Sequence, residues 1–360
     1  MALFGKKPQS YLGIDIGTSG IKLIEISREG GRPRLYTYAY TDRAPEELGV
    51  SLIDRLDETA ALLKKMLKAA KARSVKAISG LPGSAVFSSV LSVPVLPAKE
   101  LSAYIESQAS KLIPMPITDV ILDWKPYGPA APEAPKANAP EAGRQKTTKV
   151  ILTAAAKSMV KKYIDIFKKT GLELSSLETE AFALIRSLVG KDKSIIAIVD
   201  IGAVRTNVII VENGVPVLSR SIALGGLNFT KTIGAMLQMD PSNAEQFKRD
   251  AKMLGTLFAE GQIPKTLEQV FIPIGNEVRY SFNLFAGQNE TPKKVEKLIL
   301  TGGSATLPQL AAFLTKLLGI NAYIGDPFAR TLFHEELRPV LNEIAPRFAV
   351  SAGLAMREFE

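Results

Sequence analysis

The sequence contains no cysteine and a single histidine, His334. Thiol catalysis, iron–sulfur clusters and zinc fingers are therefore excluded, as is any histidine-dependent triad that is not built on His334. No run of about eighteen apolar residues occurs, so we expect no membrane-spanning helix. Residues 1–10 carry two lysines without a following apolar segment, which predicts that the chain has no secretory signal and stays in the cytosol.

Two common phosphate-binding motifs are also missing. The chain has no G-x-x-x-x-G-K-[ST] segment, and no two glycines stand at positions i and i+2. Neither a P-loop nor a Rossmann G-x-G-x-x-G turn is therefore available. A phosphate ligand must be held in another way.

The length and net charge of the chain indicate how many domains it forms and which class of partner it favours. A chain of 360 residues is expected to form two or three domains, and its net charge of +9 favours an acidic partner such as a nucleotide, nucleic acid or an anionic membrane face. The basic segments 64–76 and 157–169 have the apolar spacing of helices. Aromatic residues are not interleaved with their lysines, which weakens a nucleic-acid interpretation and leaves either solvated helix faces or a ligand-binding patch.

Short apolar strands alternate with amphipathic helices along most of the chain, which is typical of an α/β protein. The elements expected in the first half are strands over residues 12–16, 22–26, 77–81, 86–93 and 119–127, a helix over 52–72, and a helix beginning at Pro97. Four prolines within residues 128–148 predict a surface loop. The alternation resumes at Val150.

One internal duplication stands out. Residues 11–26 align with residues 196–211, and each copy is an apolar strand, Asp-Ile-Gly, a short turn and a second apolar strand. Asp15 corresponds to Asp200 and Gly17 to Gly202. A glycine in such a hairpin lets backbone N–H groups approach a phosphate closely. Each hairpin alone could be an ordinary turn, but the pair predicts two related lobes that face one phosphate chain.

A glycine pair near the C-terminus predicts a further ligand contact. Residues 298–304 form an apolar strand that ends in Thr-Gly-Gly-Ser, and apolar spacing over residues 307–314 predicts that a helix follows. Glycines expose flat peptide planes on which a ring can lie, and a helix N-terminus presents free N–H groups. The same pattern also occurs as a simple packing device.

These motifs stand in the order found in the actin-like ATPase superfamily, which the chain resembles over nearly its whole length. Residues 15–22 resemble its first phosphate motif, 200–206 the second and 301–304 the adenosine motif, while 177–184 and 348–355 are similar to its two connecting helices. Residues 79–84, 96–101 and 113–114 resemble the PilM family of type IV pilus assembly proteins and, less closely, FtsA. The resemblance implies an α/β, actin-like (ribonuclease H-like) fold of two lobes with a nucleotide cleft and an inserted FtsA-type 1C subdomain.

The resemblance also implies domain boundaries. The core of the first lobe, subdomain 1A, would comprise residues 1–82 and 158–195, and subdomain 1C would comprise residues 83–157. The second lobe would span residues 196–345, with subdomain 2B at about 227–295. Residues 346–360 would form the C-terminal connecting helix.

ATP and Mg²⁺ are the ligands that the resemblance implies. Asp15 and Asp200 would position the metal, largely through water, because Mg²⁺ gives up its hydration shell reluctantly. The residues implied to hold the nucleotide are Gly17, Thr18, Ser19 and Lys22 at the β-phosphate, Gly202, Arg205 and Thr206 at the γ-phosphate, Gly225 and Gly226 at the edge of the second lobe, and Glu245, Lys248, Gly302, Gly303 and Ser304 around the adenosine. For Glu245 and Lys248 an ordinary exposed helix face is the alternative.

Hydrolysis would need a residue that orients a water molecule at the γ-phosphate. The resemblance places this residue on the first connecting helix, where Glu178 and Glu180 both qualify, and Asp200 could share the role. Neither glutamate is followed by the proline that FtsA-like relatives have there. We therefore expect firm ATP binding with slow or regulated hydrolysis.

The function implied is that of a cytosolic scaffold at the inner face of the cytoplasmic membrane. It would capture the cytosolic N-terminal tail of a PilN-like membrane protein and couple it to the pilus assembly ATPase. Residues 83–157 would form the groove for this tail together with the first lobe, and Tyr104, Ile105 and Trp124 are either groove or core residues.

Two other functions of the superfamily remain as alternatives. A small-molecule kinase is disfavoured by Arg205, which stands where an acidic neighbour would be expected, and by the lack of a polar cluster for a sugar. An FtsA-like filament former is disfavoured because no amphipathic membrane helix follows residues 356–359.

Overall fold

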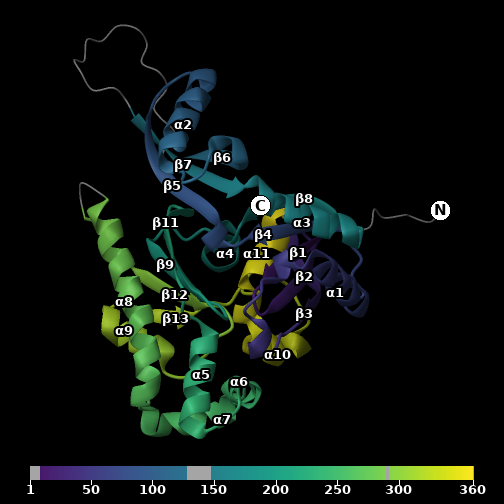
Figure 1. The fold of residues 1–360 in the computed structure, drawn as a ribbon, viewed down its shortest axis with the longest axis vertical. Coiled ribbons are helices and arrows are strands. Elements are labelled where there is room, and N and C mark those ends of the chain that lie inside the picture. The colour runs from purple at the N-terminus through teal and green to yellow at the C-terminus, as the bar shows by residue number, and fades with distance from the viewer. Residues whose placement is uncertain (1–8, 128–146, 289–291, 360) are drawn as a thin grey trace, which may run out of the picture. The chain divides into compact units, whose positions relative to one another are not determined.

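The computed structural model describes residues 9–127, 147–288 and 292–359. These residues form two compact units, of which one comprises residues 83–161 and the other the remainder of the described chain (Figure 1). No helix of the described residues is both long enough and apolar enough to cross a membrane.

The larger unit contains two five-stranded sheets. The first has the order β3-β2-β1-β4-β8. Its strands are β1 (Ser10–Gly17), β2 (Gly20–Glu29), β3 (Arg32–Tyr40), β4 (Lys76–Leu81) and β8 (Glu173–Thr179). Strands β1, β2 and β3 are antiparallel neighbours, whereas β4 and β8 run parallel to β1. β1 is buried along nearly its whole length, as its continuous apolar run requires.

The second sheet repeats this topology in the order β11-β10-β9-β12-β13. Its strands are β9 (Ile196–Ile201), β10 (Thr206–Glu212), β11 (Val215–Ile222), β12 (Lys297–Thr301) and β13 (Ala322–Ile324). Again three antiparallel strands are followed by two parallel ones. The duplication predicted from residues 11–26 and 196–211 is thereby confirmed as a repeat of two strand hairpins and the sheets around them.

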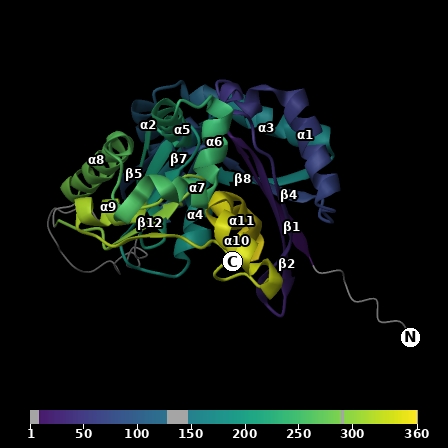
Figure 2. The ribbon, with the colours of Figure 1, turned by 90° about the horizontal axis from the view of Figure 1, so that it is seen from below.

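Helices cover the sheets and connect them. They are α1 (Leu56–Ala69), α3 (Lys157–Thr170), α4 (Glu180–Leu184), α5 (Gly226–Leu237), α6 (Pro241–Arg249), α7 (Ala251–Gly255), α8 (Lys265–Gly287), α9 (Leu310–Leu318), α10 (Arg338–Ile344) and α11 (Ala349–Met356). Figure 2 shows α1 and α11 on opposite sides of β1. We call the first sheet with α1 the first lobe, and the second sheet with α5, α6, α8 and α9 the second lobe.

The helix α11 packs tightly between the two lobes. The buried cluster around it contains residues from both sheets and from α4, namely Tyr11, Ile78, Leu184, Ile198, Ile209 and Leu354. A Cβ atom at Gly353 would lie 1.8 Å from the Ala183 carbonyl oxygen, and one at Gly13 would lie 1.9 Å from the Ser351 carbonyl oxygen. Small residues therefore permit the close crossing that the sequence predicts for its connecting helices.

In the described residues of the smaller unit, a three-stranded antiparallel sheet packs with the helix α2 (Ala98–Leu112). Its strands are β5 (Val86–Pro94), β7 (Thr147–Ala156) and β6 (Val120–Tyr127), in the order β5-β7-β6. Ile105 is fully buried in its core, and Tyr104 and Trp124 pack against the same cluster. The geometry within this unit favours the core interpretation of these three residues.

Two boundaries differ from those expected. The helix predicted over residues 52–72 is a short 3-10 turn followed by α1, because Arg55 adopts φ −110° and ψ 67° and interrupts the helix. Strand β7 begins at Thr147 rather than at Val150, since Thr147 and Thr148 pair with Pro94 and Val93 of β5. The predicted loop over residues 128–148 otherwise lies outside the described residues.

Candidate nucleotide-binding site

The hairpin of β1 and β2 brings two opposite charges together. Asp15 and Lys22 are directly opposite each other in the antiparallel register, so their side chains share one face of the sheet. Both residues are buried; Lys22 Nζ lies 3.6 Å from Asp15 Oδ2 and 3.4 Å from Ser19 Oγ. A Cβ atom at Gly17 would lie 2.9 Å from Lys22 Nζ, so glycine leaves the space that the ammonium group occupies. Thr18 lies in the same turn.

The second hairpin carries Asp200, whose pKa responds to the charges of Asp15 and Lys22. Asp200 is opposite Asn207 of β10, which hydrogen-bonds its carboxylate. Burial, followed by the negative charge of Asp15, raises the pKa of Asp200 to about 6, although Lys22 and Asn207 oppose the shift. Two carboxylates and one ammonium group from the two lobes thus act on one another.

These carboxylates are a suitable partial donor set for Mg²⁺. Within the part of the chain that the structure describes, no three His, Cys, Asp or Glu side chains gather closely enough to hold a metal by themselves. Mg²⁺ commonly takes one or two carboxylates and completes its octahedron with water and phosphate oxygens. Asp15 and Asp200 fit this pattern, and they would not suit a metal that needs an all-protein cage.

The residues expected at the γ-phosphate are arranged differently. Thr206 is fully buried, and its hydroxyl donates to the Leu224 carbonyl oxygen at 2.7 Å, so it supports the start of α5. The Arg205 side chain is exposed, whereas its backbone carbonyl accepts from Gly202 N at 2.9 Å and closes the turn. The structure therefore brings Gly202 into the site, but it does not bring Arg205 or the Thr206 hydroxyl to Asp200.

Helix α6 carries the polar group expected at the adenosine. Lys248 Nζ donates to Glu245 Oε2 at 2.6 Å, to Thr230 Oγ1 at 2.9 Å and to the Gly226 carbonyl oxygen at 3.0 Å. Burial lowers the pKa of Lys248 even though Glu245 opposes it. Burial acts to raise the pKa of Glu245, but Lys248 and the hydrogen bonds from Thr230 and Arg249 outweigh it and lower that pKa. Glu245 and Lys248 are not an ordinary exposed helix face.

Gly226 approaches this group closely, and Gly302 approaches Asp200. Gly226 N donates to the Gly202 carbonyl oxygen at 2.8 Å, and a Cβ atom at Gly226 would lie 2.5 Å from Ser304 Oγ and 3.2 Å from Lys248 Nζ. Gly302 has φ +89°, and a Cβ atom there would lie 2.5 Å from Asp200 Oδ1. Gly225, Gly226, Gly302 and Ser304 thus connect the phosphate hairpins with α6.

The prediction of free N–H groups at a helix start beside Gly303 is wrong. Helix α9 begins only at Leu310, because Gln309 adopts a left-handed conformation and turns separate it from the glycine pair. Gly302 N instead donates to the Pro346 carbonyl oxygen, and Ser304 N to that of Ile201. Backbone hydrogen bonds within the protein fix the Gly302–Gly303 turn. The turn could therefore provide a surface that fits a ligand, but it provides no helix dipole.

The two candidate catalytic glutamates have different surroundings. Glu178 is not on a helix, as residues 177–184 predicted, because β8 continues to Thr179. Arg186 Nη1 and Nη2 donate to the two oxygens of Glu178 at 2.5 and 3.2 Å, and Arg357 Nε lies 3.5 Å from Oε2. Glu180 begins α4, and its charge and that of Asp15 add to burial in raising the pKa of Tyr163.

Three further residues at the site escaped the sequence analysis. Arg249 Nε donates to Glu245 Oε1 at 2.8 Å, and the guanidinium groups of Arg249 and Arg347 both pair with Asp42. The i, i+4 spacing of Glu245 and Arg249 could have identified the first pair. No local pattern connects Asp42 with Arg347, because the two residues are more than 300 positions apart.

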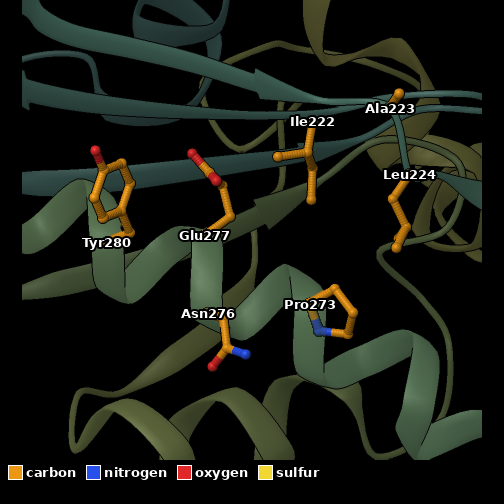
Figure 3. A pocket seen from close by; sticks show the side chains of 7 residues that line it. All are labelled: Ile222, Ala223, Leu224, Pro273, Asn276, Glu277 and Tyr280. Carbon is orange, nitrogen blue, oxygen red and sulfur yellow. The ribbon is translucent and has the colours of Figure 1, made fainter.

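A separate cavity lies on the second lobe, and its wall includes Leu224, which directly precedes the glycine pair Gly225–Gly226 (Figure 3). It has a volume of about 540 Å³ and opens between the end of β11 and α8, beside Pro273. Glu277 on its wall forms a 2.5 Å ion pair with Arg220, whose guanidinium stacks over Tyr280.

Comparison with known proteins identifies the family. The family model described as type IV pilus assembly protein PilM matches residues 13–359. The chain belongs to the PilM family. This PilM-family chain is also 23% identical over 354 residues to the cell division protein FtsA of Bacillus subtilis (strain 168), an alignment that covers 88% of the chain and 78% of the relative.

Solved structures confirm the actin-like fold of this PilM-family chain. A structure of the PilM–PilN type IV pilus biogenesis complex superposes with a TM-score of 0.80 at 27% identity, covering 98% of the chain and 100% of the other. MreB5 of Spiroplasma citri bound to AMPPNP superposes with a TM-score of 0.53 at 13% identity, covering 99% and 97%. The ethanolamine utilization protein EutJ of Carboxydothermus hydrogenoformans gives 0.56 at 13% identity, covering 97% and 90%. At 13% identity these last two show the fold alone.

Proposed function

We propose that this PilM-family chain binds Mg-ATP between its two lobes and uses it as a conformational ligand. The observation that carries the proposal is the meeting of Asp15 and Lys22 from the first hairpin with Asp200 from the second. Such a cluster has unbalanced charge and little access to water. A cation beside the two carboxylates and a phosphate beside the ammonium group would satisfy both needs.

Different residues of the chain would bind different parts of the ligand. Lys22 would contact phosphate oxygens as a point charge, with Ser19 and the backbone around Gly17 beside it. Asp15 and Asp200 would hold Mg²⁺, which would neutralise part of the phosphate charge when bound. Lys248 and Glu245, with the Gly302–Gly303 turn, would flank the adenosine.

Hydrolysis would be slow at most. Glu178, one of the two candidate glutamates, is already engaged by Arg186 and Arg357, so its carboxylate is poorly suited to orient a water molecule. Glu180, the first residue of α4, is the remaining candidate. The nucleotide would then chiefly shift the balance between open and closed lobes.

The partner we propose is the cytosolic N-terminal tail of a PilN-like membrane protein. Support comes from the solved PilM–PilN complex, which matches this chain over nearly its full length at 27% identity. The chain would act as a scaffold at the inner face of the membrane and pass the nucleotide state to the assembly machinery, including the pilus assembly ATPase. That the inserted unit forms part of the groove for the tail stays a prediction.

The test is a titration of the full chain, with and without Mg-ATP, against a synthetic peptide of the PilN-like tail from the same genome. Saturable binding whose affinity changes with nucleotide is the expected result. A scrambled peptide of identical composition is the control, because the chain carries a net charge of +9 and could attract any acidic peptide. Equal binding of the two peptides, or no binding in either nucleotide state, would refute the scaffold.

A further inference from the structure

Asp42 joins elements that are distant in the sequence. It follows β3 in the first lobe, and its Oδ2 accepts a hydrogen bond from Arg249 Nη1 at 2.7 Å, while its Oδ1 accepts from Arg347 Nη2. Arg249 ends α6 of the second lobe. Arg347 lies in a short 3-10 helix, Ala345–Phe348, directly before α11. We call Asp42, Arg249 and Arg347 the Asp42 cluster.

The cluster holds two cations that would otherwise repel each other. Burial is the largest cause that lowers the pKa of Lys248, and Glu245 opposes it. The positive charges of Arg249 and Arg347 lower the same pKa further, so three cations lie close together at this end of the site. Glu245 balances Lys248 and one side of Arg249. Asp42 is the only partner that the described residues provide for both guanidinium groups together.

The neighbours of Asp42 are bonded to the first phosphate hairpin. Arg43 N donates to the Ser19 carbonyl oxygen at 2.9 Å, and Arg43 Nη1 donates to that of Thr18 at 3.0 Å. Thr41 N donates to the Ile21 carbonyl oxygen at 2.9 Å, and Ile21 N donates back to Thr41 Oγ1 at 3.0 Å. Residues 41–43 therefore move with the turn that contains Thr18 and Ser19.

We propose that Asp42 is a positioning residue that couples the phosphate end of the nucleotide site to its adenosine end. This inference rests on the proposed nucleotide site and deepens it. Ordering of the Thr18–Ser19 turn by a phosphate fixes Asp42, and Asp42 in turn fixes Arg249 on α6. Opening of the lobes must break the Asp42–Arg249 ion pair, whereas Arg347, whose guanidinium lies 4.6 Å over the ring of Tyr40 in β3, keeps Asp42 in place on the first lobe. The cluster therefore slows release of the nucleotide.

The size of the effect follows from exposure. The side chains of Asp42, Arg249 and Arg347 are 26%, 39% and 21% exposed, so solvent and salt weaken their interaction. Pairs of this kind each contribute little, and the two together are expected to change nucleotide affinity by roughly three- to tenfold. High salt should remove most of that difference.

The experiment compares wild type with Asp42→Asn, which keeps the shape of the side chain and removes its charge. Dissociation of a fluorescent ATP analogue in the presence of Mg²⁺ is followed by stopped flow at low and at high NaCl. Asp42→Asn should release the analogue roughly three- to tenfold faster at low salt and lose the salt dependence that wild type shows. Arg249→Lys, which keeps the charge, should be intermediate.

The matched control is Asp57→Asn. Asp57 forms a 2.6 Å ion pair with Lys169 that is also exposed, but it joins α1 to α3 and involves no element of the second lobe. Its release rate and salt dependence should equal those of wild type. The melting temperature without nucleotide should be unchanged in both variants, because exposed pairs contribute little to global stability.

A second measurement follows the lobes directly. The chain has no cysteine, so spin labels can be placed cleanly at Lys65→Cys on α1 and Asn283→Cys on α8, which are exposed positions of the two lobes. Electron–electron distances with Mg-ATP should be longer or broader in Asp42→Asn than in wild type.

The outcomes separate the two proposals. If wild type fails to bind the nucleotide, both the proposed site and this coupling are overturned. If wild type binds it and Asp42→Asn matches wild type in release rate, salt dependence and lobe distance, the coupling alone is overturned. An effect of Asp57→Asn as large as that of Asp42→Asn would also overturn it, since a general change of surface charge would then be the cause.

Discussion

The phosphate end and the adenosine end of the candidate site are organised in opposite ways. At the phosphate end, Lys22 and Asp15 stand 3.6 Å apart, and Asp200 is held with a raised pKa. At the adenosine end, Lys248 has three acceptors within 3.0 Å. The charges at the phosphate end are not balanced without a ligand, whereas the hydrogen-bonding groups of Lys248 at the adenosine end are already satisfied by the protein.

This difference indicates distinct roles for similar residue types. Two carboxylates beside one ammonium group leave an excess of negative charge, which favours a ligand that brings a cation, so most of the selectivity for a Mg-triphosphate should come from the phosphate end. The hydrogen-bond network at the adenosine end contributes shape and rigidity, and its hydrogen bonds must be retained when the ligand binds. Substitutions at the two ends should therefore affect different quantities.

The largest effect is expected from Lys22→Ala. Loss of the ammonium group removes a charge-assisted contact to phosphate and leaves the two carboxylates facing the ligand, so ATP affinity should fall roughly 10- to 100-fold. The rise in melting temperature that saturating Mg-ATP produces in wild type should disappear. Thermal unfolding with and without Mg-ATP is the measurement, and Lys65→Ala on the exposed face of α1 is the control. An unchanged shift would remove the phosphate assignment.

A smaller effect, of a different kind, is expected from Lys248→Met. Methionine replaces the aliphatic stem but leaves Glu245 largely buried without its main partner, which should cost about 2 kcal/mol of unfolding free energy in the absence of nucleotide. Urea denaturation measures it, and Lys231→Met at an exposed position of α5 is the matched control. Stability equal to wild type would mean that the adenosine-end network does not support the fold.

Asp200→Asn should stabilise the chain without ligand. Because the pKa of Asp200 is raised from 3.8 to about 6, the folded chain binds a proton more tightly than the unfolded chain over this range. Stability is therefore lost as pH rises through the range, and asparagine should restore about 1 to 2 kcal/mol at pH 7.

Urea denaturation of wild type and Asp200→Asn at pH 5 and pH 7 measures this difference. The gain should be larger at pH 7, and the variant should no longer respond to Mg-ATP. A variant that is less stable than wild type at pH 7 would contradict the raised pKa.

The elements that a contiguous sequence pattern determines are predictable from the sequence. The two Asp-Ile-Gly hairpins were predictable because an apolar strand, a carboxylate and a glycine turn are contiguous, and the duplication identified both sheets. The lack of a proline or glycine near residue 179 hid the end of β8, so Glu178 was placed on a helix that begins only at Glu180. Pairing with β4 determines that boundary, and pairing is not a local property.

The Asp42 cluster could not be predicted for a related reason. Its three residues lie in three separate segments, and each is an ordinary charged residue in its own surroundings. Thr206 shows the converse case. A threonine after a phosphate turn fits a ligand contact by pattern, but tertiary packing directs its hydroxyl to the Leu224 carbonyl oxygen.

The close packing of α11 against β1 has a consequence for how the chain acquires its structure during synthesis. Gly13 of the first strand is in contact with the backbone of Ser351 and Ala355, more than 300 positions later in the sequence. One face of the first sheet therefore stays uncovered until α11 has left the ribosome. Long-range closure of this kind is slow and leaves apolar surface exposed in the meantime. The nascent chain should accordingly depend on chaperone protection until α11 has been synthesised.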